Sequence, residues 1–230
     1  MSMMAEGHGA ETVAGRVAMV HERIVAACQR AGRADRPQVI AVTKNQDPAI
    51  LPALATAGLH CYGENRVEHL RLMHAVAPPN SAFAYIGRVQ SRQLTTVATY
   101  CTSLHALADI RHVRRLAEAC RRLERRLEVF VQVNTSHEAG KAGVEPQGLP
   151  AVLDACRTHE DVLNVVGLMT MAPDIRGSGD DGTVRRTFAD LRTLAETHAV
   201  PGLSMGMSTD YEIAIEEGAT HLRLGTILFP

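Results

Sequence analysis

The feature that most constrains the fold of this 230-residue chain is a regular alternation of short apolar runs with helical patterns. Eight apolar runs predict β-strands: VIAVT from Val39, HCYGE from His60, FAYIG from Phe83, TSLHA from Thr102, EVFVQVN from Glu128, NVVGLMT from Asn164, GLSMG from Gly202 and HLRLGT from His221. Helical patterns separate them, beginning near Pro48, Arg66, Arg92, Ala108, Gln147, Thr183 and Asp210. Because each helix returns the chain to start the next strand in the same direction, the alternation requires a parallel sheet. Eight strands favour closure, so we expect a single α/β domain over residues 1–230, folded as a (β/α)8 TIM-type barrel.

One helix precedes this repeat. Apolar residues recur at helical spacing from Glu11 to Ala31, and Gly32 follows as a stop signal. The last predicted strand is followed only by ILFP, which leaves no room for an eighth helix after it. We therefore expect the extra N-terminal helix to cover the barrel beside the last strand, and residues 1–10 to be disordered.

The charge balance and the cysteine pattern narrow the classes of partner. Lys and Arg number 24 against 25 Asp and Glu, so the net charge of -1 gives no reason to expect nucleic acid or an anionic membrane. No apolar run approaches the roughly 20 residues of a membrane span, and no secretion signal opens the chain. The five scattered cysteines form no CxxC pair, and the histidines show no metal-ligand spacing. We expect a cytoplasmic, metal-free monomer that binds a compact ligand.

Polar residues gather where the predicted strands end. Lys44 ends the first strand, Asn65 the second and Ser208 the seventh, while Gly225 and Thr226 follow the eighth. A lysine at a solvated strand end ordinarily lays its stem on apolar surface and leaves its amine in water, so Lys44 alone identifies no site. The carboxyl ends of parallel barrel strands share one face, however, and barrel enzymes build their sites there. The sequence therefore predicts a site at this rim.

Two of these segments are suited to a phosphate group. Ser208 and Thr209 precede a helix expected near Asp210, and Gly225 and Thr226 form a turn on the adjacent strand. Helix N-termini and the N–H groups of glycine turns attract anions, and barrels often place phosphate after strands seven and eight. Ser and Thr are also ordinary helix caps, so each segment by itself is weak evidence.

A lysine that faces a phosphate site indicates a Schiff base with a phosphorylated aldehyde. A sheltered, apolar setting would lower the amine pKa and suit Lys44 to that bond. Pyridoxal phosphate and sugar-phosphate aldol chemistry both fit this pattern. Arg223 favours pyridoxal phosphate, because it lies two residues before Gly225, on the same face of the strand, where a cation could meet a pyridine nitrogen.

Six segments resemble the pyridoxal-phosphate homeostasis protein family: AVTK, GENRVEH, IGRVQS, QVNTSHEAGKAGV, GLMTMAP and LSMGMSTDYEIAIEEGATHLRLGTILF. The resemblance extends from about residue 12 to residue 229, and the family shares its fold with the N-terminal barrel of alanine racemase. It implies a Schiff base on Lys44 and a pyridine-nitrogen contact from Arg223. It also implies phosphate binding by Ser208 with the backbone of Gly225 and Thr226, and a pocket lined by Asn65 and Met205 to Met207.

The sequence departs from the family pattern at several positions. Ala84 stands where the family usually has His, and Arg92 and Gln93 stand where it usually has Asn-Lys. The chain ends at Pro230 in FP, where the family usually has FG. A second lysine near a strand end, Lys141, is expected to bind an anion or a partner rather than the aldehyde.

Two functions follow from these observations: a carrier that holds pyridoxal phosphate and supplies it to apoenzymes, and a pyridoxal-phosphate-dependent amino-acid racemase. Racemisation needs proton donors on both faces of the bound substrate, and Lys44 serves only one. In alanine racemase a tyrosine from an additional domain serves the other face, and this sequence has no such domain. An arginine at the pyridine nitrogen also weakens the ring as an electron sink. We therefore expect a non-catalytic carrier, with the racemase as the alternative.

Overall fold

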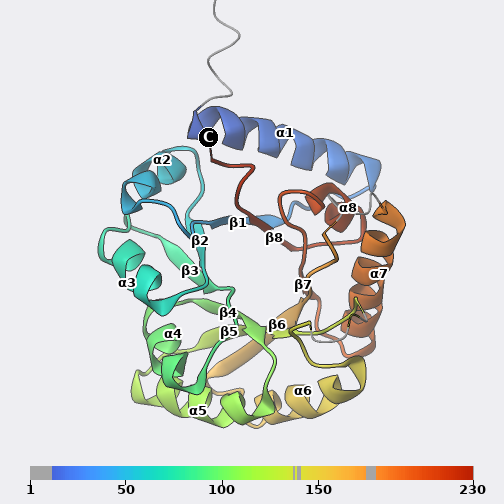
Figure 1. The fold of residues 1–230 in the computed structure, drawn as a ribbon. Helices are drawn as coiled ribbons and strands as arrows, with labels where there is room; N and C mark the ends of the chain where they lie inside the picture. The colour runs from blue at the N-terminus through green and yellow to red at the C-terminus, as the bar shows by residue number, and fades with distance from the viewer. Residues whose placement is uncertain (1–11, 137, 139–140, 175–179, 230) are drawn as a thin grey trace, which may run out of the picture.

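The computed structural model describes residues 12–136, 138, 141–174 and 180–229. Eight parallel strands close into a barrel in chain order (Figure 1). They are β1 (Gln38–Val42), β2 (Cys61–Glu64), β3 (Ala82–Tyr85), β4 (Ser103–Leu107), β5 (Leu127–Gln132), β6 (Leu163–Met169), β7 (Gly202–Ser204) and β8 (His221–Leu224). The predicted (β/α)8 barrel is confirmed, and every predicted strand is present. The expected disorder of residues 1–10 falls outside the described residues.

The helices form a ring around the strands (Figure 1). They are α1 (Val13–Arg30), α2 (Leu51–Thr56), α3 (Val67–Ala75), α4 (Leu94–Tyr100), α5 (Ile110–Arg122), α6 (Leu149–Arg157), α7 (Asp181–Thr197) and α8 (Tyr211–Glu216). Single 3-10 turns lead into three of them, at Pro48–Ile50, Ser91–Gln93 and Pro146–Gly148. No helix in the described part of the chain is long and apolar enough to cross a membrane.

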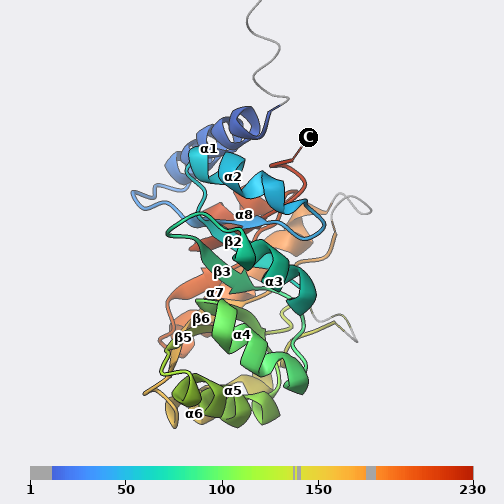
Figure 2. The same ribbon diagram turned by 90° about the vertical axis from the view of Figure 1, so that its left-hand side faces the viewer.

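The extra N-terminal helix closes the ring. The Thr12 hydroxyl caps α1 by accepting a hydrogen bond from the Gly15 N–H at 3.1 Å. Val17, Val20 and Ile24 are buried, and α1 packs against α2 and α8. Figure 1 places it across β1 and β8, and both views place it on the side of the barrel opposite α5 and α6 (Figures 1 and 2). The predicted position of the leading helix is therefore confirmed.

Two kinds of core stabilise the barrel. The larger core lies between the strands and the helices, and all five cysteines are buried as free thiols. The smaller one consists of Ile40, Cys61 and Ala84 and lies in the barrel interior. Ile40 of β1 is in register with Arg223 of β8, and side chains in register on parallel strands share a face. A separate cluster joins Phe130 to Ala106 and Met169. The interior also holds buried polar groups on β4, β7 and β8, which bear directly on the site.

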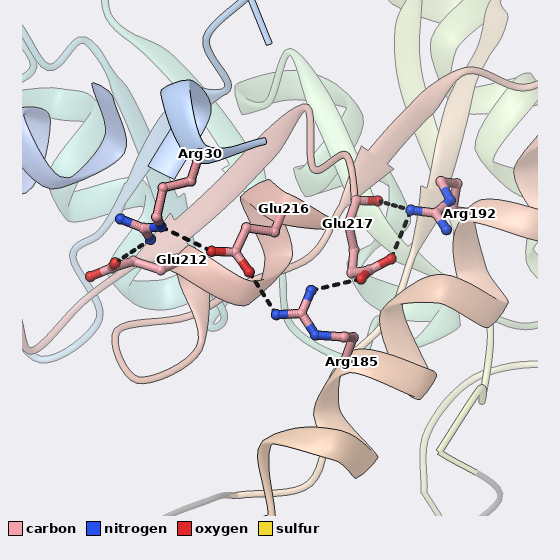
Figure 3. Close-up of polar contacts among 6 residues, drawn as sticks. All are labelled: Arg30, Arg185, Arg192, Glu212, Glu216 and Glu217. Atoms are coloured by element: carbon pink, nitrogen blue, oxygen red, sulfur yellow. Dashed lines mark hydrogen bonds and ion pairs between the residues drawn. The ribbon is translucent and has the colours of Figure 1, made fainter. Parts of the chain in front are cut away.

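Helix α8 is only six residues long, so it depends on contacts with its neighbours. Glu217, just after its end, accepts from Arg185 and Arg192 of α7 at 2.8 and 2.7 Å. Glu216 accepts from Arg185 at 2.6 Å and from Arg30 of α1 at 3.2 Å. Figure 3 shows this ion-pair cluster, which Glu212 extends through Arg30. The cluster holds α8, and therefore the segment before it, at the carboxyl end of β7.

Candidate functional site

A cavity of about 440 Å³ opens at the carboxyl ends of the strands. It is lined by most of the residues predicted for the site: Lys44, Asn65, Met207, Ser208, Arg223, Gly225 and Thr226. Val42, Ile86 and Met171 add apolar surface to its wall, which the sequence patterns did not identify. The fold thus brings the ends of six strands, β1, β2, β3, β6, β7 and β8, together around one space.

Lys44 lies in a tight turn just beyond β1, which ends at Val42 rather than at the lysine. The Gln46 N–H donates to the Thr43 carbonyl at 2.9 Å, so Lys44 and Asn45 form the centre of the turn. Asn45 adopts the left-handed conformation with φ +70°, which asparagine tolerates better than most residues. The Lys44 side chain is exposed, which corrects the expectation of an apolar shelter. Any shelter for this amine has to come from a bound ligand, because the protein leaves it open to water.

Asn65 follows β2 and is held by the end of β3. The Tyr85 hydroxyl donates to the Asn65 carbonyl at 3.1 Å, and burial raises the pKa of Tyr85 to about 12. A Cβ at Gly87 would lie 2.5 Å from the Asn65 carbonyl oxygen, so only glycine allows this approach. The cavity wall between β2 and β3 is therefore tightly packed.

The turns after β7 and β8 present N–H groups to the cavity. The Ser208 hydroxyl accepts from the Gly225 N–H at 3.2 Å and from the Ile227 N–H at 3.4 Å, which joins the two turns. Among the described residues, no acceptor pairs with the backbone N–H groups of Ser208, Thr209 and Thr226. Unpaired donors converging on a concave surface suit an anion.

Asp210 supports the turn after β7. Its carboxylate accepts from the Met207 N–H at 2.6 Å. Burial raises the pKa of Asp210 above its usual range, while that hydrogen bond and the nearby Arg223 charge oppose the rise. The Asp210 carboxylate therefore accepts a hydrogen bond that stabilises the turn in which it lies. The positive charge of Arg223 partly neutralises this carboxylate, which lies close to the unpaired N–H donors.

Arg223 lies fully inside the barrel end, and its guanidinium is anchored on two sides. One nitrogen donates to the Ser204 hydroxyl at 2.7 Å and another to the Thr170 carbonyl at 2.8 Å. Burial lowers the pKa of Arg223 to about 10, so the group stays charged at neutral pH. It is a fixed cation facing the cavity.

The hydrogen-bond chain continues from Ser204 into the barrel. His105 Nδ1 lies 2.8 Å from Ser204 Oγ, and His105 Nε2 lies 3.0 Å from Ser103 Oγ. The His105 ring stacks on Phe130 with centroids 4.2 Å apart. Burial, with the Arg223 charge nearby, holds the pKa of His105 well below its usual range. No sequence motif predicted this chain of hydrogen bonds, although the alternation of Ser103 and His105 along an apolar strand is typical of a polar interior face.

Met205 does not line the cavity. It is fully buried in the large core outside the barrel, while Met207 reaches the cavity wall. Successive side chains point to opposite faces, so Met205 follows the inward-facing Ser204 outward. Gly206, with φ +92°, then turns the chain toward the cavity. The expectation for Met205 is thus corrected by the direction of the strand.

Lys141 does not line the cavity of Lys44 but lines a second cavity of about 690 Å³, together with Arg111, Gln132 and Arg88, which lines both cavities. Its ammonium is paired with Glu138 at 2.9 Å. The positions that depart from the family pattern lie elsewhere. Ala84 packs in the barrel interior, and the Gln93 side chain accepts from the Gln90 N–H at 2.9 Å. Arg92 is exposed, and Pro230 lies outside the described residues.

The side chains that line the cavity support a limited range of reactions. Apart from Lys44, its titratable lining within the described residues consists of Arg88, Asp174, Asp210 and Arg223. No histidine, cysteine or tyrosine is among these lining residues, and the described chain contains no cluster suited to a metal ion. The arrangement therefore fits an anionic aldehyde that reacts with one primary amine, with apolar surface between the two ends.

Comparison with known proteins places this arrangement in context. The family model described as alanine racemase, N-terminal domain, matches residues 4–230. A pyridoxal phosphate homeostasis protein of Aquifex aeolicus is 34% identical over 222 residues, covering 93% of this chain and 96% of its own. A protein of the same name in Pseudomonas aeruginosa is 35% identical over 223 residues, covering 95% of each chain.

Two solved structures are also similar to this chain in fold. PipY of Synechococcus elongatus, solved without PLP, matches with a TM-score of 0.84 and 28% identity over 95% of this chain and 100% of its own. The structure of the same protein with PLP bound matches with a TM-score of 0.81 and 27% identity over the same shares.

Proposed function

This chain belongs to the pyridoxal phosphate homeostasis protein family, and from that membership and the cavity around Lys44 we propose that it binds pyridoxal 5'-phosphate, holds it as a Schiff base on Lys44 and supplies it to apoenzymes. One observation carries the proposal. Among the described residues, a single cavity has on its wall one lysine, Lys44, the unpaired N–H donors of the turns after β7 and β8, and the buried cation of Arg223.

The phosphate end of the ligand matches the two turns. The N–H groups of Ser208, Thr209 and Thr226 are open to an acceptor, and the Gly225 N–H can exchange its bond with the Ser208 hydroxyl for a bond to phosphate. Charge-assisted hydrogen bonds of this kind are about twice as strong as neutral ones. Phosphate recognition is therefore the main source of affinity in this proposal.

Lys44 serves the other end of the ligand. Its uncharged amine attacks the aldehyde carbon, and the aldehyde oxygen leaves as water when the carbon–nitrogen double bond forms. Water reverses the reaction by hydrolysing the carbon–nitrogen double bond. A carrier that must release its ligand requires such a reversible bond. The exposure of Lys44 supports this role, because water and a recipient protein can both reach the bond.

Arg223 favours the carrier over the racemase. A guanidinium that stays charged at neutral pH disfavours a protonated pyridine nitrogen opposite it. The described lining also offers no histidine, cysteine or tyrosine to exchange a proton on the face away from Lys44. We therefore propose holding and delivery, without turnover, as the function.

We also propose that the carrier acts in the cytoplasm as a monomer. The five buried free thiols support a reducing compartment, and the open cavity supports delivery without a partner subunit. Size-exclusion chromatography with light scattering tests the monomer. A stable dimer would overturn that part of the proposal.

The test is borohydride reduction of the protein after incubation with pyridoxal 5'-phosphate, followed by peptide mass spectrometry. The sequence contains only two lysines, Lys44 and Lys141, so each serves as the control for the other. We expect the pyridoxyl mass on Lys44, its loss in Lys44→Arg and its retention in Lys141→Arg. A transfer assay with an apoenzyme then tests delivery. The pyridoxyl mass on Lys141 alone would contradict the proposed site.

A further inference from the structure

The turn that carries Lys44 is contacted at both ends by one hydrogen-bonded pair of side chains, the buried Glu64 and the partly buried His69. Glu64 is the last residue of β2, and its side chain is 0% exposed. One carboxylate oxygen accepts from the Thr43 hydroxyl at 2.5 Å, and the other lies 2.8 Å from His69 Nδ1. The second ring nitrogen, Nε2, lies 3.1 Å from the Gln46 carbonyl oxygen.

Thr43 and Gln46 are the two ends of the Lys44 turn. Their own hydrogen bond, from the Gln46 N–H to the Thr43 carbonyl, closes the turn but does not attach it to the barrel. At the Thr43 end, the Thr43 N–H donates to the Gly63 carbonyl of β2 at 3.1 Å and the Thr43 hydroxyl donates to Glu64 of the same strand. At the Gln46 end, the contact comes from His69 in the first turns of α3. Lys44 and Asn45 project from a loop whose two ends are fixed to different elements.

Both ring nitrogens of His69 have an oxygen partner within hydrogen-bond distance. Both partners of His69 are oxygen acceptors, and a neutral imidazole donates from only one nitrogen. Loss of His69 would leave the buried Glu64 carboxylate with the Thr43 hydroxyl as its side-chain partner. Removal of one partner from a buried charge is costly.

We propose that Glu64 and His69 are positioning residues for Lys44, which fix the turn so that the lysine amine meets the ligand aldehyde in the cavity. The inference rests on the proposed function and adds the residues that set how well Lys44 captures its ligand. Neither residue lines the cavity, and the phosphate-binding turns lie on β7 and β8, so the pair acts on the aldehyde end only.

Two ligands separate this role from general structural damage. Pyridoxal 5'-phosphate carries the aldehyde, whereas pyridoxine 5'-phosphate has the same ring and phosphate with an alcohol in its place. We expect His69→Ala to lower affinity for the aldehyde about tenfold or more, since small misplacement of a reacting group has large effects. Affinity for the alcohol should stay within about twofold, because its phosphate contacts are intact.

A ligand-free measurement tests the same point. In the apoprotein, hydrogen exchange at the Gln46 amide should be faster in His69→Ala than in wild type, while peptides from β7 and β8 exchange as before. His74→Ala is the matched control, since His74 lies on the same helix but packs on Phe83 and Tyr100, away from the turn. It should leave both affinities and the Gln46 exchange rate unchanged.

Thr43→Val provides a second variant if His69→Ala does not fold. It keeps a branched side chain but removes the hydroxyl that donates to Glu64. It should likewise lower the affinity for pyridoxal 5'-phosphate and leave the affinity for pyridoxine 5'-phosphate nearly unchanged. Equal losses for both ligands, or no loss for either, would overturn the positioning role. The proposed function fails separately, if wild-type Lys44 yields no borohydride-trapped adduct at all.

Discussion

The Arg223 guanidinium donates a hydrogen bond of 2.7 Å to the Ser204 hydroxyl inside the barrel, and Ser204 also bonds to His105. One hydroxyl thus connects a charged group at the cavity to a neutral histidine deep in the interior. Because a hydroxyl can donate one bond and accept others, Ser204 accepts from Arg223 and donates to His105. This assignment leaves a proton on His105 Nε2, which faces Ser103.

Ser204→Ala should lower the free energy of unfolding by about 2 kcal/mol, since it leaves a buried cation and a buried ring nitrogen each one partner short. Urea denaturation measures the change. Thr193→Ala removes a hydroxyl from an exposed position of α7 and should cost far less. Equal costs for the two variants would show that the interior chain contributes nothing.

The stability of the protein should fall as pH drops from 7 to 5. Burial, with the Arg223 charge, holds the pKa of His221 at about 4 in the folded state, against about 6.5 in the unfolded chain. Between these values the unfolded state binds more protons, so stability is lost as pH falls, by about 2 kcal/mol at pH 5 for His221. His105 adds to the loss in the same direction.

Denaturation of wild type and His221→Gln at pH 7 and pH 5 checks this prediction. Other titrating groups cancel in the comparison, so the variant should lose less stability on acidification than the wild type. The same pH dependence in both proteins would contradict the assignment to His221.

Removal of the phosphate from the ligand should weaken binding strongly, because pyridoxal cannot use the N–H donors of the turns after β7 and β8. Ser208→Ala should weaken binding of the phosphorylated ligand, by about tenfold, since it breaks the link between these turns. It should change the binding of pyridoxal much less. Absorbance titrations of both ligands give the four dissociation constants, and equal affinities for the two ligands would contradict the phosphate site.

The ion-pair cluster of Figure 3 should be strongest at its most buried member. Glu217, whose side chain is 10% exposed, accepts from two arginines, so Glu217→Gln should cost about 1–2 kcal/mol of unfolding free energy. Glu212→Gln, at the exposed end, should cost well under 1 kcal/mol. Thermal denaturation at low and high salt measures both. A larger effect at Glu212 would reverse the expected order.

The α-proton of L-alanine should exchange slowly or not at all when the amino acid is added to the loaded protein in heavy water. Arg223 disfavours the protonated ring, and the described cavity lining offers no histidine, cysteine or tyrosine for the second face. Deuterium incorporation measured by NMR is the test. Rapid exchange with formation of D-alanine would favour the racemase alternative.

The sequence by itself determined the barrel and the rim on which the candidate site lies. Apolar runs and helical patterns are local properties, and their eightfold alternation leaves few topologies open. The rule that parallel strands end on one face then brought Lys44, Asn65, Ser208 and Arg223 together before any contact was known. These predictions succeeded because they needed only periodicity and chain direction.

The tertiary structure alone decided which side chains touch. Ser204 and His105 lie 99 positions apart, and only the closed barrel brings them together. The hydrogen bonds of Glu64 and His69 to the two ends of the Lys44 turn likewise depend on how β2 and α3 pack beside β1. Met205 points outward because it follows the inward-facing Ser204 at the end of β7, and no local pattern specifies which residue of this strand faces inward. A shift of one residue reverses the face of every side chain in a strand, so contacts of this kind follow from register and closure rather than from composition.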